Sequence, residues 1–180
     1  MLPDDNSDEC ELVLTTSKEA HLFRRRDVMI GEELDSDPDV TRGQILSRLT
    51  GGGGTLLIGI DPGLRMGMAA FYGETKVASH TFNSMDRLCA AVLKLVGSVR
   101  AVRSTIRIGN GNPSIADTLA STLMAHLPDT TVEIVDESGT SLRHKRAKGM
   151  QTDQSAAARI AFRKGMGTRV YGQFLGQKKS

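Results

Sequence analysis

Two different spacings of apolar residues recur along the chain and predict both strands and helices. The run "TLLIGID" at 55–61 is almost wholly apolar and ends on an acid, as a buried strand would. The stretches 67–73 and 76–82 flank "GET", a short glycine-containing turn, and therefore predict a hairpin. Shorter β-branched runs at 104–109 and 130–137 predict two further strands.

Helical spacing appears between and after these strands. Residues 84–97 repeat apolar side chains every three to four positions, with Ser84 as an N-cap and Gly97 as a stop. Residues 113–127 open with a proline, which suits the first turn of a helix. An alanine-rich stretch that begins at Asp153 predicts the last helix. The order β-β-β-α-β-α-β-α predicts an α/β fold with a mixed sheet and helices on its faces.

The first 50 residues have a different character. Two acidic, turn-rich segments surround "SKEAHLFRRRDVMI", which predicts a short helix, and "TRGQILSRL" predicts another that docks on the body. Gly51 to Gly54 have no side chains and predict a flexible joint. We therefore expect residues 1–54 to be an acidic, partly disordered extension with a glycine linker. We expect 55–170 to be the folded domain and 171–180 a basic tail.

Composition and charge narrow the range of possible functions. The net charge of +2 conceals −6 over the first 50 residues and +8 over the rest. A basic body favours a polyanionic partner such as nucleic acid, although solvated surface charge explains the same numbers. The two cysteines are far apart and share no motif, which favours a reducing, cytoplasmic compartment and disfavours a zinc site. No apolar run approaches the roughly 20 residues of a membrane span, so we expect no membrane association.

Acidic residues mark one candidate site. Asp61 ends the first strand of the body, Asp136 and Glu137 end the last, and Asp153 starts the final helix. Ligands gather at the carboxyl ends of strands in α/β sheets, so these acids can meet in space. Clustered carboxylates need a compensating cation, and hard oxygen ligands suit Mg²⁺ or Mn²⁺. Taken singly, each acid has an ordinary structural explanation in a turn, a strand end or a helix start.

Basic residues lie next to these acids in the sequence. The loop "SLRHKRAKGMQ" lies between Glu137 and Asp153, and its cations would bind phosphates without reading base sequence. The candidate nucleic-acid-binding residues of this loop are Arg143, Lys145, Arg146 and Lys148. Arg65, in the turn after Asp61, is a further candidate for a phosphate contact. The alternative is a solvated loop with no ligand.

Three motifs in series carry a resemblance to a known family. "IGIDPGLRMGMA", "VDESGTS" and "TDQSAAARIA", within about residues 55–165, together resemble the RuvC/YqgF-like family of the ribonuclease-H-like superfamily. The resemblance implies a five-stranded mixed sheet, with the first three strands antiparallel and helices on both faces. It also implies a two-metal catalytic site in which Asp61, Glu137 and Asp153 are the ligands. The fourth strand ends "IRIGNGNP", without the acid of RuvC-type resolvases, so the chain resembles the YqgF side more closely.

This resemblance implies a divalent-metal-dependent nuclease that hydrolyses phosphodiester bonds in structured RNA, as in ribosomal RNA maturation. One alternative is a Holliday-junction resolvase-like endonuclease on branched DNA, which would be a homodimer. Another is a non-catalytic nucleic-acid-binding protein on the same fold. An actin-like ATPase is disfavoured, because that architecture needs two such domains and this chain has room for one.

Overall fold

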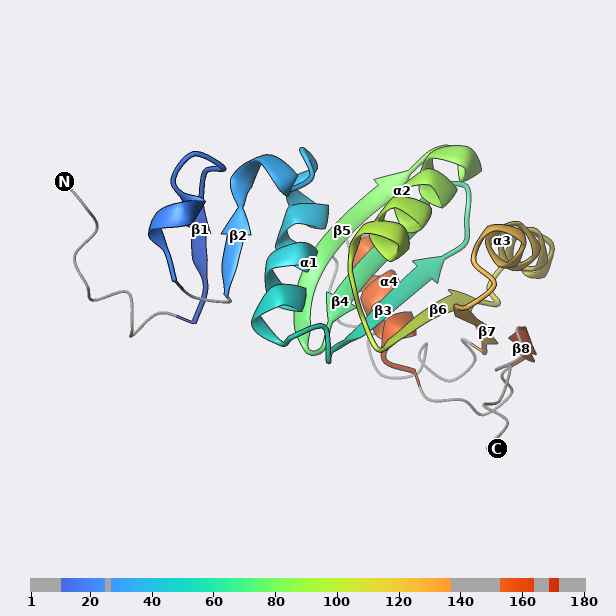
Figure 1. The fold of residues 1–180 in the computed structure, drawn as a ribbon. Coiled ribbons are helices and arrows are strands. Elements are labelled where there is room, and N and C mark those ends of the chain that lie inside the picture. Colours follow the sequence, from blue (N-terminus) through green and yellow to red (C-terminus); the bar gives the residue numbers. More distant parts are fainter. Residues whose placement is uncertain (1–10, 25–26, 137–152, 164–168, 172–180) are drawn as a thin grey trace, which may run out of the picture.

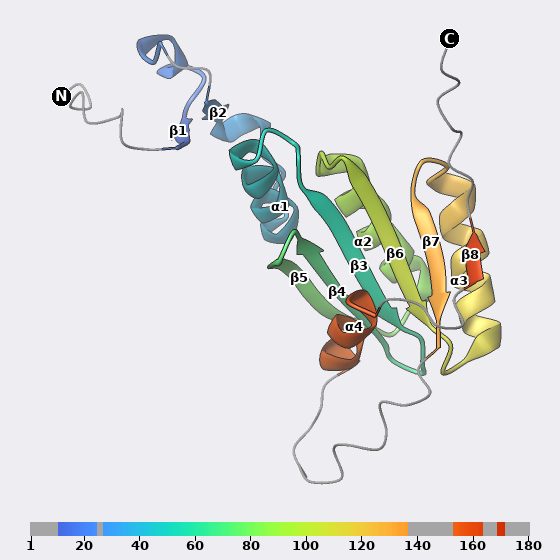
Figure 2. The ribbon, with the colours of Figure 1, turned by 90° about the horizontal axis from the view of Figure 1, so that it is seen from below.

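A six-stranded mixed sheet forms the centre of the molecule, with helices on both of its faces (Figures 1 and 2). The computed structural model describes residues 11–24, 27–136, 153–163 and 169–171, and only the backbone at 153–154 and 169–171. The strand order is β5-β4-β3-β6-β7-β8. None of the described helices is long and apolar enough to cross a membrane.

The first three strands of the sheet form an antiparallel meander, and the next two run parallel to its central strand. The meander comprises β3 (Thr55–Asp61), β4 (Met66–Tyr72) and β5 (Thr75–Phe82). The strands β6 (Arg103–Gly109) and β7 (Thr131–Val135) continue the sheet from β3. This arrangement confirms the α/β class and the antiparallel order of the first three strands.

A sixth strand corrects the expected count of five. The segment β8 (Arg169–Tyr171) pairs antiparallel with β7 at the edge of the sheet. Three residues are too few to give a periodic signal, so the sequence pattern did not predict this strand.

The two faces of the sheet carry separate apolar clusters. Alternate residues of β3 and β6, such as Ile58 and Ile106, pack under α2 (Met85–Ser98) and α3 (Pro113–His126). On the opposite face, residues of β4 pack against α4 (Asp153–Ala161). The helices α2, α3 and α4 agree with the predicted ones to within one residue at their starts. Figure 2 shows α4 lying across β3 and β4, on the face away from α2 and α3.

The helix α1 (Pro38–Leu49) is part of the main core. Val40 is 1% exposed within that core, and buried Ser47 donates a hydrogen bond to the carbonyl of Arg100 (2.6 Å). The helix ends where Gly51 and Gly52 take positive φ angles of 60° and 77°. Their N–H groups donate to the last helical carbonyls, over 3.0 and 2.7 Å. The glycines therefore form a hydrogen-bonded helix cap, where the sequence predicted a flexible joint.

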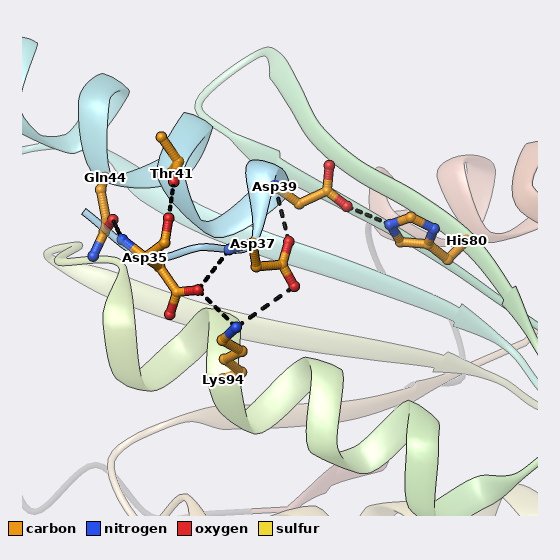
Figure 3. Close-up of polar contacts among 7 residues, drawn as sticks. All are labelled: Asp35, Asp37, Asp39, Thr41, Gln44, His80 and Lys94. Carbon is orange, nitrogen blue, oxygen red and sulfur yellow. Dashed lines mark hydrogen bonds and ion pairs between the residues drawn. The ribbon is translucent and has the colours of Figure 1, made fainter. Parts of the chain in front are cut away.

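Acidic residues at the start of α1 dock it on α2 and β5 (Figure 3). Asp37 accepts a hydrogen bond from the Asp39 N–H (3.0 Å) and so caps the helix. Lys94 of α2 pairs with Asp35 (2.7 Å), and His80 of β5 contacts Asp39. The hydrogen bond from Lys94 lowers the pKa of Asp35, and Asp35 in turn raises the pKa of Lys94. Each of these acids thus has a structural partner.

The helix predicted within residues 17–30 is wrong. The described residues of that region, 17–24 and 27–30, hold a 3₁₀ turn, Ala20–Leu22, followed by β2 (Val28–Ile30). The strand β2 pairs in parallel with β1 (Val13–Thr15), apart from the main sheet, and a second 3₁₀ turn, Gly31–Glu33, follows it. The β-branched ends of "VMI" favour an extended strand over a helix.

Candidate functional site

Asp61 ends β3 at the carboxyl edge of the sheet, as predicted. Side chains alternate along a strand, so Asp61 shares a face with Leu57 and Gly59. Leu57 packs against the cluster that contains Ala157 and Ala161 of α4. Asp61 is half-buried, and its alternation with Leu57 and Gly59 places it on the face that α4 covers, opposite the large core.

A close backbone contact places α4 on this face. A Cβ atom at Gly59 would lie 2.0 Å from the Ala157 carbonyl oxygen and 2.6 Å from the Ala161 nitrogen. Only a glycine lets the helix backbone come this near to the strand. The helix begins at Asp153, four residues or about 6 Å of helical rise before Ala157. The fold thus brings the backbone of Asp153 to the same face of the sheet as Asp61. The structure does not describe the side chain of Asp153.

An ion pair beneath α4 holds the other end of the helix. Arg107 of β6 donates from Nε to Glu133 of β7 (2.8 Å) and from Nη1 to the carbonyl oxygen of Ala161 (2.6 Å). The Arg107 and Glu133 side chains are only 15% and 19% exposed. A cation here satisfies a carbonyl in the last turn of α4 and complements the helix dipole. Arg107 is thus a positioning residue for α4.

The Arg107–Glu133 pair was not predicted, although its signal is present in the sequence. Arg107 interrupts the apolar run "IRI", and Glu133 interrupts "VEI". The two strands are neighbours, and these residues face each other in register. Opposite charges at matching positions of two otherwise buried strands indicate a cross-strand ion pair.

The carboxyl ends of β6 and β7 are joined by polar contacts. The Asn110 side-chain amide donates to Asp136 Oδ1 (3.1 Å), and the Asn110 N–H donates to the carbonyl of Val135 (3.0 Å). The strand β6 itself ends on Gly109 and brings no acid to this edge. The contact with Asn110 gives Asp136 a structural role at the end of β7.

Of the remaining acidic and basic candidates, some are exposed and others lie outside the residues that the structure describes. Arg65 is exposed in the turn between β3 and β4, close in sequence to Asp61. Asp117, the first acid after β6, lies exposed inside α3. Five predicted site residues lie outside the described residues: Glu137, Arg143, Lys145, Arg146 and Lys148.

The predicted metal ligands are Asp61, Glu137 and Asp153, and of these only Asp61 has a described side chain. Among the side chains that the structure describes, no group of three or more His, Cys, Asp or Glu lies close enough to hold a metal ion. Asp61 supplies one carboxylate, whose hard oxygen atoms suit Mg²⁺ or Mn²⁺. The sequence prediction adds Glu137 and Asp153 to Asp61 as metal ligands.

Comparisons with known proteins add no assignment. No protein-family model matches this chain, and no curated protein is significantly similar to it in sequence.

Proposed function

We propose that this protein is a divalent-metal-dependent nuclease that hydrolyses phosphodiester bonds in structured RNA. The observation that carries the proposal is the placement of Asp61 and the start of α4 on one face of the sheet. That placement depends on Gly59 and its contact with Ala157. The antiparallel meander followed by parallel strands fits the ribonuclease-H-like fold that the three sequence motifs imply.

The proposed roles follow from chemistry and position. Asp61, Glu137 and Asp153 would hold Mg²⁺ or Mn²⁺, which when bound activates a water and stabilises the leaving oxygen of a phosphodiester. Asp61 is fixed by its place in β3, where it pairs with Gly67 of β4. A ligand held on a strand keeps its direction better than one on a loop.

Cations next to the acids would bind the substrate backbone. Arg65 is exposed in the turn that follows Asp61, and a guanidinium group matches the oxygen atoms of a phosphate. The predicted basic residues of the 137–152 segment would extend this contact. Such contacts read no base sequence, so cleavage by the proposed enzyme would not depend on the base sequence of the RNA.

The resolvase alternative has less support. Its family pattern places a carboxylate at the end of the fourth strand of the domain, which is β6 here. In this chain β6 ends on Gly109, and the neighbouring Asn110 amide is bonded to Asp136. Fewer acids at this edge favour the RNA nuclease over the resolvase.

A substrate panel tests the proposed function. We expect the purified full-length chain to cleave a structured RNA in Mg²⁺ or Mn²⁺ and to lose that activity in EDTA. Linear duplex DNA and four-way DNA junctions serve as comparison substrates, and product lengths are read on denaturing gels. Faster cleavage of the junction would favour the resolvase. Salt-dependent binding without cleavage of any substrate would support the non-catalytic protein and overturn the proposal.

A further inference from the structure

A pocket of about 380 Å³ lies at the opposite edge of the main sheet from Asp61. The pocket is lined by residues from three places: β2 and the residue before it, α1 and the glycine turn after it, and the connection from α2 to β6. The Val102 N–H donates to the Gly54 carbonyl (2.9 Å), so this connection runs beside the amino end of β3. The length of β3, about 20 Å, separates this edge from Asp61. The pocket therefore belongs to a region that the proposed nuclease site does not use.

Arg100 is held at this pocket through its backbone. Its carbonyl accepts hydrogen bonds from Ser47 Oγ (2.6 Å) and from the Tyr72 hydroxyl (3.1 Å). Ser47 and Tyr72 are 5% and 4% exposed, so both bonds are made in the interior. A bond made in the interior competes little with water and fixes the backbone from which the arginine extends.

The Arg100 side chain lies against a glycine turn. A Cβ atom at Gly52 would lie 3.0 Å from Arg100 Nε and 3.1 Å from its Cδ. Gly52 also has a φ of +77°, which other residues rarely adopt. Glycine at position 52 thus allows the positive φ angle of the turn and leaves space for the Arg100 side chain to pack over it. Among the residues that the structure describes, none accepts a hydrogen bond from the Arg100 guanidinium group.

A second arginine lines the same pocket. Arg48, the next residue after Ser47 in α1, donates from Nη2 to the carbonyl of Val28 (3.3 Å). Asp27 is the acidic residue among those that line the pocket, so two arginines and one acid contribute to its lining. The planar fork of a guanidinium matches the oxygen atoms of a phosphate group, and Met29 adds an apolar wall.

We propose that this pocket binds a phosphate group on the guanidinium groups of Arg48 and Arg100. The group would belong to a free nucleotide or to a nucleic-acid strand, since both present the same oxygen atoms. The proposal does not depend on the nuclease activity, because it uses none of the acids of the α4 face.

Nuclear magnetic resonance of the full-length chain tests the proposal with three separate probes: inorganic phosphate, adenosine monophosphate and a short single-stranded RNA. We expect saturable shifts of the Arg100 Nε–H and Gly52 N–H signals. The Arg100→Gln variant should weaken binding at least about tenfold, which is the loss of a charge-assisted hydrogen bond. Arg100→Lys should restore part of the affinity, because it keeps the charge and loses the fork.

Arg42→Gln is the matched control, because Arg42 is an exposed arginine of α1 that does not line the pocket. It should bind every probe like the wild type. Arg100→Gln keeps the two backbone hydrogen bonds, so circular dichroism should show an unchanged fold. Tight binding of adenosine monophosphate would identify a nucleotide site, and preference for the RNA would identify a strand site. Equal affinity of Arg100→Gln and wild type for all three probes would overturn the proposal.

Discussion

Replacing Asp61 with asparagine is expected to reduce metal-dependent RNA cleavage by about a thousandfold, or about 4 kcal/mol of transition-state stabilisation. The amide has nearly the shape of the carboxylate, so β3 should keep its pairing with β4. It has no negative charge to hold a divalent cation at the carboxyl edge of the sheet. The measurement is the single-turnover cleavage rate of a structured RNA in Mg²⁺, for wild type and Asp61→Asn side by side.

Asp117→Asn is the control for this substitution. Asp117 is an exposed acid within α3, so its replacement changes the net charge equally without touching the α4 face. We expect this variant to cleave at the wild-type rate. Equal rates for Asp61→Asn and wild type would show that the observed hydrolysis does not come from this site.

Replacing Gly59 with alanine is expected to lower the free energy of unfolding by about 3 kcal/mol or more. The added methyl group would lie 2.0 Å from the Ala157 carbonyl oxygen and 2.6 Å from the Ala161 nitrogen. Both are backbone atoms, so relief requires α4 to shift as a whole away from β3. Urea denaturation measures the stability, and hydrogen exchange of the α4 amides reports whether the helix stays docked.

Gly97→Ala provides the matched comparison. Gly97 lies in α2, and a Cβ atom there would meet nothing within 4 Å. An alanine in a helix is favoured over glycine by up to about 1 kcal/mol, so this variant should be as stable as the wild type or more stable. Equal stability of the two alanine variants would contradict the close contact between β3 and α4.

The body of the fold was predictable because its signals are local. Each strand of the meander and each of the helices α2 and α3 has its own apolar period and its own start or stop residue. The place of Asp61 at the carboxyl edge followed in the same way, from an apolar run that ends directly before Pro62 and Gly63.

The contacts that position α4 were not predictable from local pattern. In the sequence, Gly59 is an ordinary small residue of a strand. Its role depends on contact with Ala157, which lies nearly a hundred residues later in the chain. The Arg107–Glu133 pair likewise depends on which strands become neighbours. The sequence does not distinguish the helix cap at Gly52 from a flexible joint, because glycine favours both flexibility and left-handed turns.

The most direct test of the central claim is Mn²⁺ binding, followed by electron paramagnetic resonance on the full-length chain. The wild type is compared with Asp61→Asn, Glu137→Gln and Asp153→Asn, and Asp117→Asn is the control. If the three acids hold the metal together, the wild type and the control bind Mn²⁺, and each of the other three variants binds it at least about tenfold more weakly. A wild type that binds no Mn²⁺, or site variants that bind it as tightly as the control, would contradict the proposed metal site.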